Sequence, residues 1–199
     1  MQNELSLIRH GDTIGTLKKM FYGSTDLPLA KEGINQILKL KALNIYPDAE
    51  NACLYTSGMK RTEETFSLIY GNKFHKTIPE LREIGIGRLE MTSFKEASSE
   101  PSIQAWEKGK VENLKFPGGE FYKDFENRVK KGLMKLRNNS QNKNVIAVLH
   151  GAVIFTSMEL MFPGVKSNCF EWIPKPAEGY KITIKNGNPV CYTKIGQQD

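Results

Sequence analysis

The strongest constraint on the fold is a regular alternation along the chain between short apolar runs and longer amphipathic stretches. The apolar runs have the length of buried strands, and the stretches that follow them repeat their apolar residues at the three-and-four spacing of a helix. The expected strands cover residues 5–8, 52–56, 74–78 and 145–149, and the expected helices cover residues 30–43, 59–69, 121–136 and 153–161. This order predicts an α/β fold with three α/β/α layers, in which helices cover both faces of a largely parallel sheet.

Two stretches depart from this alternation. Residues 85–120 are rich in loops, with scattered glycines and two prolines, and we expect them to form a cap over the carboxyl edge of the sheet. Residues 180–184 and 190–195 flank Asn186-Gly187, which predicts a C-terminal hairpin. No repeat or proline-rich linker divides the 199 residues, so we expect a single domain over residues 1–199.

The composition is that of an ordinary globular protein, with 39% hydrophobic and 25% charged residues, and it excludes disorder, collagen and coiled coil. The longest aliphatic run is residues 145–149, far below the roughly 20 residues that span a bilayer. The N-terminus carries Glu4 where a secretory signal has basic residues. We therefore expect a cytoplasmic protein with no membrane partner. The widely spaced Cys53, Cys169 and Cys191 are expected to be reduced thiols that pack as small core residues.

The charge balance of 28 basic against 22 acidic residues leaves a net charge of +6. An anionic ligand or a lysine-rich solvated surface would each explain it, and we favour the surface because no basic run exceeds two residues. No nucleic-acid partner is expected. The three histidines lack the spacing of metal ligands, so no metal is expected either.

Polar residues with a capacity for chemistry follow the expected strands. His10 and His150 each come after an apolar strand and before a glycine, while Ser57 and Arg61 follow the strand at residues 52–56. Ligands of open α/β sheets bind beyond the carboxyl ends of the strands, and a guanidinium recognises phosphate through two parallel hydrogen bonds. Two unrelated turn histidines are the alternative, but the repeated setting favours a site in which both histidines, Arg9 and Arg61 converge on a dianion.

Six motifs in order carry a resemblance to a known family. They are Leu7-Ile8-Arg9-His10-Gly11-Asp12-Thr13; Asp26-Leu27-Pro28-Leu29 with Gly33; Ser57 with Arg61; Leu81-Arg82-Glu83 with Gly87; Pro117-Gly118-Gly119-Glu120; and Val148-Leu149-His150-Gly151. Together they resemble the histidine phosphatase, or phosphoglycerate mutase-like, superfamily over about residues 5–155 and the terminal hairpin. The Arg-His-Gly triplet alone is a weak signal, whereas the ordered set is specific.

The resemblance implies a mechanism without metal or cofactor. It makes His10 the nucleophile that forms a phosphohistidine, with a backbone carbonyl, which the sequence does not locate, fixing its tautomer. Arg9, Arg61 and His150, the last acting as a cation, would surround the phosphate oxygens. Glu83 would protonate the leaving oxygen and then activate water, which requires a raised pKa.

Further positions match the pattern less specifically. Thr13, Ser57 and Glu120 are expected in the phosphate pocket or just behind it, although a turn hydroxyl or a helix-start glutamate explains each nearly as well. Gly11 and Gly151 are expected to approach the phosphate beside the two histidines. Four residues depart from the common pattern: Thr16 replaces a frequent asparagine, Met91 a glycine, Phe121 a serine and Phe155 an arginine.

The resemblance favours hydrolysis of a small phosphorylated molecule. The chain lacks room for the longer insertion of the cofactor-dependent mutases, and residues 21–29 are similar to the α-ribazole-5′-phosphate phosphatases of cobalamin synthesis. Phosphoglycerate mutase activity and a non-catalytic phosphate-binding or partner-binding domain are the alternatives. The loop-rich region offers aromatic contacts to a ring, yet packing under its own loops is favoured for each of Trp106, Phe116, Phe121 and Tyr122. A monomer or a homodimer is expected.

Overall fold

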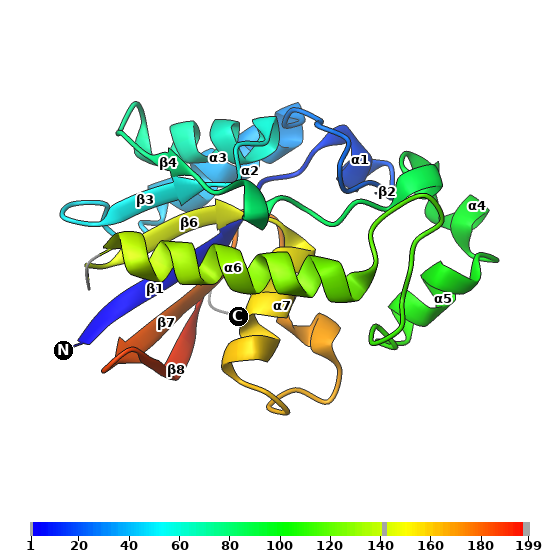
Figure 1. Cartoon of the computed structure of the whole chain (residues 1–199). Coiled ribbons are helices and arrows are strands. Elements are labelled where there is room, and N and C mark those ends of the chain that lie inside the picture. Colours follow the sequence, from blue (N-terminus) through cyan, green and yellow to red (C-terminus); the bar gives the residue numbers. More distant parts are fainter. Residues whose placement is uncertain (1, 141–142, 197–199) are drawn as a thin grey trace.

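In a computed structural model, which describes residues 2–140 and 143–196 apart from the Cys169 side chain, the centre of the fold is a six-stranded mixed sheet. In spatial order its strands are β4 (Lys76–Thr77), β3 (Cys53–Thr56), β6 (Val145–Leu149), β1 (Gln2–Arg9), β7 (Gly179–Lys185) and β8 (Asn188–Ile195). The first four are parallel to one another, and β7 pairs antiparallel with both β1 and β8 (Figure 1). The predicted α/β class and the C-terminal hairpin are confirmed.

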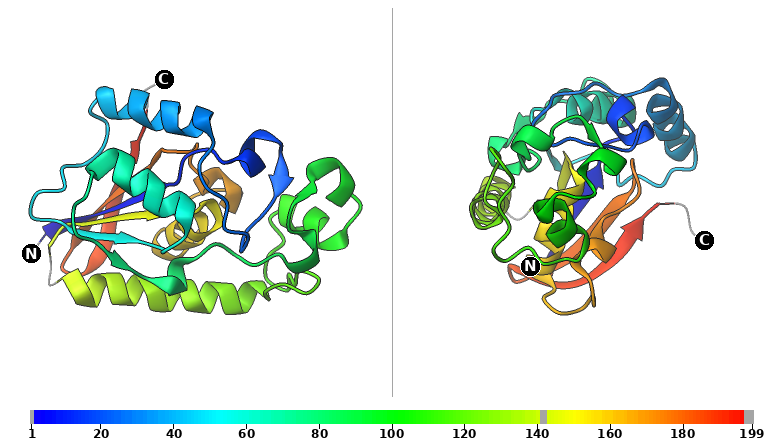
Figure 2. Two further views of the ribbon diagram at one scale, coloured as in Figure 1. Left: turned by 90° about the horizontal axis from the view of Figure 1, so that it is seen from above. Right: turned by 90° about the vertical axis from the view of Figure 1, so that its right-hand side faces the viewer.

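Helices cover both faces of this sheet, as the sequence predicts. α2 (Lys31–Ala42) and α3 (Lys60–Tyr70) pack together on one face, and α6 (Tyr122–Ser140) and α7 (Gly151–Met161) lie on the other (Figure 2). β6 is buried along its whole length, which explains why all five of its residues are apolar. Because successive side chains of a strand point to opposite faces, Ala147 packs with the α6 and α7 side, whereas Val148 packs with the α2 and α3 side.

Short elements gather beyond the carboxyl ends of the parallel strands (Figure 1). They are α1 (Ile14–Leu17), β2 (Met20–Phe21), η1 (Pro79–Leu81), η2 (Gly87–Leu89), β5 (Thr92–Ser93), α4 (Phe94–Ala97), α5 (Pro101–Glu107) and η3 (Cys169–Trp172). The sequence predicts a cap from residues 85–120 alone. The cap also takes in residues 20–21, because β2 pairs with β5 in a separate two-stranded sheet.

Several boundaries differ from those expected. The strand expected at residues 74–78 is reduced to the two residues of β4, and α7 begins at Gly151, directly after His150, instead of at residue 153. The core role expected for the cysteines is wrong for Cys191, which lies exposed on the edge strand β8, and only partly right for Cys53, which is half-buried. The expectation for the Cys169 side chain lies outside the described part of the chain.

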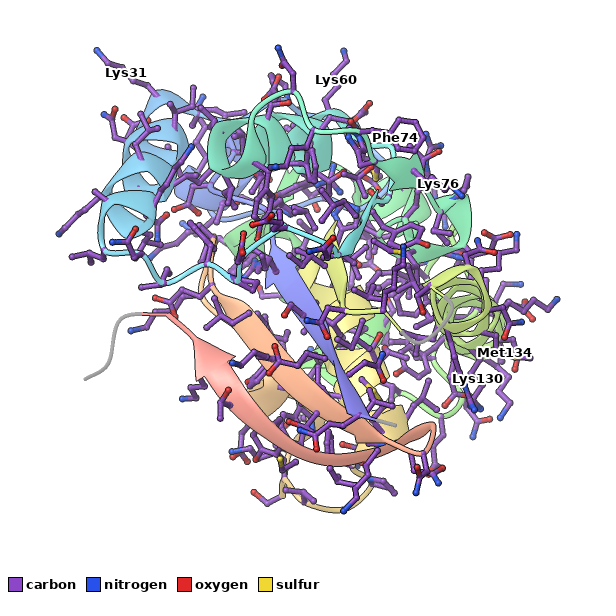
Figure 3. All side chains as sticks on the ribbon, turned by 90° about the vertical axis from the view of Figure 1, so that its left-hand side faces the viewer. Lys31, Lys60, Phe74, Lys76, Lys130 and Met134 are labelled. Carbon is purple, nitrogen blue, oxygen red and sulfur yellow. The ribbon has the colours of Figure 1, made fainter. Side chains whose placement is uncertain are left out.

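The surface carries many isolated lysines. Figure 3 shows Lys31, Lys60, Lys76 and Lys130 projecting from four different elements into solvent. This distribution agrees with the interpretation of the positive charge as a solvated surface. Among the described residues, none of the helices combines the length and the apolar character that a membrane crossing requires.

Candidate active site

The residues that follow β1, β3 and β6 meet at the carboxyl edge of the sheet because these three strands are neighbours. His10 and His150 lie with their ring centroids 5.3 Å apart in an edge-to-face arrangement. The backbone N–H of His10 donates to the Leu149 carbonyl at 3.0 Å, so the two strand-end histidines are fixed relative to each other by the sheet itself. The convergence expected from the strand order is what the fold produces.

The His10 ring has one defined tautomer. Its Nδ1 lies 2.7 Å from the Gly11 carbonyl oxygen, which only accepts, so Nδ1 carries the proton and Nε2 keeps a lone pair. Burial, reinforced by the positive charges of Arg61 and Arg9, holds the pKa of His10 well below its usual value. The ring is therefore neutral at neutral pH, and its unprotonated nitrogen is available to attack. The backbone carbonyl that was expected to fix the His10 tautomer, and that the sequence did not locate, is the carbonyl of Gly11.

Two arginines flank this ring. Arg61 is fully buried, and its Nη1 and Nη2 donate to the carbonyls of Thr25 and Gly23 at 2.9 and 2.8 Å. Arg9 donates from Nη1 to the Pro174 carbonyl at 2.8 Å, while its Nε is buried and has no hydrogen-bond partner among the described residues. A buried guanidinium nitrogen without an acceptor is costly. An anionic oxygen at this position would supply the missing acceptor.

His150 differs from the expectation. Arg61 Nε donates to His150 Nδ1 at 3.2 Å, and a guanidinium has no acceptor, so Nδ1 is unprotonated. The other ring nitrogen, Nε2, lies 2.7 Å from the Ser57 hydroxyl. Burial, together with the charge of Arg61, holds the pKa of His150 well below its usual value. The expected cationic His150 is therefore wrong for this geometry: the ring is neutral, and both of its nitrogens are engaged.

The side chain of Glu83, from the loop after η1, lies at the N-terminus of α7. Its Oε2 accepts from the Ala152 N–H at 3.1 Å and its Oε1 from the Ile84 N–H at 3.0 Å. Burial raises the pKa of Glu83, and these backbone bonds and the two arginines oppose that rise only in part. A carboxyl that retains its proton at higher pH than usual, beside a neutral histidine, is suited to donate a proton.

Arg128, which sequence reasoning missed, holds the segment that carries Glu83. From α6 its Nη1 donates to the carbonyls of Glu80 and Arg82 at 2.9 and 2.6 Å, and its Nη2 donates to the Glu83 carbonyl at 2.9 Å. The Glu120 carboxylate accepts hydrogen bonds from Nε and Nη2 of the same guanidinium, each at 2.7 Å. Glu120, expected in or just behind the phosphate pocket, therefore holds Arg128.

Glu90 is a second residue that the sequence did not single out. Its carboxylate accepts hydrogen bonds from the backbone of Gly23, Ser24 and Thr25 and from the two hydroxyls of Ser24 and Thr25, at 2.6 to 3.1 Å. The carbonyls of Gly23 and Thr25 are those that hold Arg61. Glu90 thus shapes the loop that orients the buried guanidinium.

A cavity of about 520 Å³ opens beside these groups, within the range of small-molecule sites. Arg9, His10, Arg61, Glu83 and Gly151 form its polar end. Its remaining wall is mostly apolar and comes largely from the cap, with Thr16, Lys19, Met20, Phe21, Tyr22, Ile84, Ile86, Phe94, Ile103, Trp106, Phe116, Ala152 and Ile173. Of the four aromatics discussed from sequence, Trp106 and Phe116 line the cavity, whereas Phe121 and Tyr122 do not.

Four of the residues expected to bind phosphate lie outside the cavity lining: Gly11, Thr13, Ser57 and His150. The hydroxyl of Thr13 caps α1, where it accepts from the Thr16 N–H at 3.3 Å, and Ser57 is bonded to His150. Gly11 contributes its carbonyl to His10 and donates its N–H to the Thr65 hydroxyl at 3.0 Å. Of the expected set, Arg9, Arg61, Glu83 and Gly151 remain in reach of a ligand beside His10.

The departures from the family pattern have visible consequences. Thr16 lines the cavity and shares a hydrogen bond of 2.7 Å with the Tyr22 hydroxyl. Met91 adopts φ +62°, a conformation that favours glycine and costs a side chain about 1 kcal/mol. Phe121 makes a bridge to Lys115 away from the cavity.

Phe155 belongs to an aromatic cluster behind the cavity wall. It is fully buried, and its ring lies 5.5 Å from Trp106, 6.2 Å from Tyr122 and 5.4 Å from Phe170, measured between centroids. These distances are typical of favourable aromatic pairs. The position where an arginine is frequent therefore supports the apolar wall.

The residues described here offer no group of three histidine, cysteine, aspartate or glutamate side chains that would hold a metal ion. What they offer instead is a neutral histidine, two guanidinium groups and a protonatable carboxyl around one cavity. The fold and this cluster define an α/β protein with a histidine-centred site at the carboxyl edge of its sheet.

The chain belongs to the histidine phosphatase superfamily (branch 1), which it matches over residues 5–194. Members of this superfamily are generally phosphomonoester hydrolases or mutases, and the fold is phosphoglycerate mutase-like.

The individual relatives include both mutases and phosphatases. The chain is 28% identical over 139 residues to a 2,3-bisphosphoglycerate-dependent phosphoglycerate mutase of Beijerinckia indica, covering 65% of each chain and thus less than two thirds of that mutase. It is 27% identical over 154 residues to the adenosylcobalamin/alpha-ribazole phosphatase of Salmonella typhimurium, covering 75% of each. The structure of a putative alpha-ribazole-5′-P phosphatase from Escherichia coli superposes with a TM-score of 0.83 at 21% identity, covering 98% of this chain and 96% of that one.

Proposed function

We propose that the protein hydrolyses a phosphomonoester through a phosphohistidine formed on His10. The observation that carries this proposal is the state of the His10 ring: Nδ1 is bonded to the Gly11 carbonyl, so the lone pair stands on Nε2. Beside it, Arg9 Nε is buried without a partner. A neutral histidine can attack phosphorus, and a guanidinium nitrogen without a partner can bind a phosphate oxygen, so the two groups together suit a phosphate dianion.

In the first step, His10 Nε2 forms a bond to phosphorus while the bond from phosphorus to the ester oxygen breaks. Arg9 and Arg61 stabilise the charge on the phosphoryl oxygens, and the N-terminus of α7 at Gly151 adds its partial positive charge. Glu83 gives its proton to the leaving oxygen, so the alcohol departs neutral. The raised pKa of Glu83 supports this role, because the proton must still be present when substrate binds.

In the second step, ionised Glu83 takes a proton from a water molecule, whose oxygen attacks phosphorus. The bond between phosphorus and Nε2 breaks, inorganic phosphate leaves, and His10 returns to its neutral tautomer. One water molecule is consumed for each ester hydrolysed, and Glu83 ends the cycle protonated, as it began.

The cavity wall favours a leaving group with an apolar or aromatic body. Of the lining residues, the cations are Arg9 and Arg61 at the phosphate end and the exposed Lys19 on the cap. The wall otherwise presents rings such as Trp106 and Phe94. A nucleoside-like substrate such as α-ribazole 5′-phosphate would place its ring system against them, which agrees with the name of the Salmonella relative.

Mutase activity is the second candidate, and it is favoured by the similarity to bisphosphoglycerate-dependent mutases. Holding a glycerate carboxylate or a second phosphate would call for further cations around the leaving group. Phe155, where an arginine is frequent in the family, contributes none, and this is our reason for placing hydrolysis first.

The deciding experiment is hydrolysis of p-nitrophenyl phosphate by wild type and His10→Ala with EDTA throughout. We expect turnover by wild type and less than a few percent of it in the variant, and wild type quenched in alkali, where a phosphohistidine is stable, should carry phosphate on His10. Comparable activity in His10→Ala would refute the covalent mechanism. Absence of turnover together with tight binding of a phosphate analogue would instead identify a binding domain.

A further inference from the structure

Ser57, expected as a phosphate ligand, lies behind His150 in a chain of hydrogen bonds whose proton positions are all determined. The chain begins at Arg61, a donor only, so His150 Nδ1 accepts and the proton of the neutral ring stands on Nε2. That proton points to the Ser57 hydroxyl oxygen at 2.7 Å. The oxygen must therefore accept from His150.

The hydroxyl proton of Ser57 is directed away from His150. It points to the Thr62 hydroxyl oxygen at 3.0 Å, and Thr62 in turn donates to the Met59 carbonyl at 2.7 Å. The Ser57 oxygen also accepts from the Met59 N–H at 3.3 Å. Because the Ser57 hydroxyl donates its single proton to Thr62, it cannot donate to the His150 ring.

We propose that Ser57 is a positioning residue: its hydroxyl, oriented by Thr62, fixes the tautomer of His150, and His150 thereby presents a lone pair that orients Arg61 toward the phosphate. This assignment rests on the proposed function for its catalytic consequence. Ser57, Thr62 and His150 are all buried and absent from the cavity lining. Arg61 is the member of the chain that reaches the cavity.

The opposite tautomer would disrupt this arrangement. A proton on Nδ1 would face the Nε–H of Arg61, two donors 3.2 Å apart, and the guanidinium would have to turn away. Arg61 would then keep its bonds to the carbonyls of Thr25 and Gly23 but would lose the one that holds its Nε. Loss of the Ser57 acceptor therefore acts on phosphate binding at a distance, through His150 and Arg61.

Two variants distinguish positioning from direct contact. Ser57→Ala removes the acceptor, and Thr62→Val keeps a branched side chain but releases the Ser57 proton. With p-nitrophenyl phosphate we expect kcat/KM to fall about tenfold in Ser57→Ala, the effect of losing a hydrogen bond to a charged network. Thr62→Val should lower it in the same direction by a smaller factor, and Ser57→Thr should restore most of it. Ser157→Ala, a buried serine that donates to the Val153 carbonyl, is the matched control and should match wild type.

The tautomer is measured directly by ¹⁵N NMR of the imidazole nitrogens in the free wild-type protein between pH 6 and 8. We expect His150 to carry its proton on Nε2 in wild type and to show a mixture of tautomers in Thr62→Val. A proton on Nδ1 in wild type would overturn the proposal, as would a fall in kcat/KM for Ser57→Ala with an unchanged Thr62→Val. Because the NMR measurement needs no substrate, it tests the hydrogen-bond chain even if the wild type proves not to be a phosphatase.

Discussion

At the scale of single residues, the site depends on burial that pushes the pKa values of His10 and Glu83 in opposite senses. Burial and the two arginines lower the pKa of His10, and burial raises that of Glu83. Both residues are consequently more often neutral near neutral pH than an exposed histidine and glutamate would be. A neutral nucleophile and a protonated acid are the forms that the proposed first step uses.

The pH profile should reflect these two shifts. With benzyl phosphate, kcat/KM should rise as His10 loses its proton, with that limb displaced below the usual pKa of histidine. It should fall again as Glu83 ionises, with that limb displaced above the usual range of glutamate. In Glu83→Gln we expect a loss of about a hundredfold.

The control for this profile is the substrate's own ionisation, which affects wild type and Glu83→Gln alike. Only the alkaline limb that disappears in the variant is assigned to Glu83. An identical profile in both proteins would remove Glu83 from the role of acid, and a smaller loss is expected for p-nitrophenyl phosphate, whose leaving group needs no proton.

At the scale of elements, loops that carry the site are held by side chains instead of by the sheet. Glu90, next to η2, binds the loop at residues 23–25, and Arg128 of α6 binds the segment at residues 80–83. Burial alone would raise the pKa of Glu90, but the hydrogen bonds from Thr25, Gly23 and Ser24 outweigh it and hold the pKa below its usual value. The ionised carboxylate therefore stabilises the folded state.

Glu90→Gln should lower the free energy of unfolding by about 2 kcal/mol at pH 7, because several donors lose a charged acceptor. A lowered pKa in the folded state means that the stabilisation is present at neutral pH and is lost as the pH falls through that value. The difference between wild type and variant should accordingly shrink in acid. Urea unfolding at several pH values measures it.

Glu126→Gln on α6 is the matched control, since Glu126 forms ion pairs with the exposed Lys123 and Lys130. It should cost no more than about 0.5 kcal/mol. If Glu90→Gln were equally mild, the loop at residues 23–25 would not depend on this carboxylate, and its link to Arg61 would have to be abandoned.

At the scale of the whole molecule, the cavity has two walls of different origin. The sheet edge supplies the reacting groups, and the cap supplies Trp106, Phe94 and most of the apolar surface. Benzyl phosphate and ethyl phosphate leave as alcohols of similar reactivity, so a difference between them reports binding of the ring rather than chemistry. The cap should make benzyl phosphate the better substrate.

Trp106→Ala should reduce that preference about tenfold, mainly through KM, because an aromatic contact contributes on the order of 1.5 kcal/mol. Phe74→Ala, with a side chain 82% exposed on the loop after α3 (Figure 3), is the control and should keep the wild-type ratio. A preference unchanged in Trp106→Ala would place the ring of the substrate elsewhere.

The sequence predicted most of the sheet and the position of His10 and His150, because strand-ending histidines follow from local apolar runs and parallel topology. It did not predict the roles of Glu90 and Arg128, since their bonds join segments about 40 to 70 residues apart without any local pattern. The tautomer of His150 was also beyond it. The charge of that ring is set by its burial and by Arg61, which approaches from a different element.

Phe155 also limits how this protein can evolve. The side chain is fully buried and its ring contacts those of Trp106, Tyr122 and Phe170, so an arginine placed there would bury a charge among rings. A single substitution to the family's common residue should therefore destabilise the fold. To bind a more anionic substrate through this position, the protein would therefore first have to change several of the residues around Phe155. The aromatic wall thus restricts which substitutions can occur, in addition to lining the cavity.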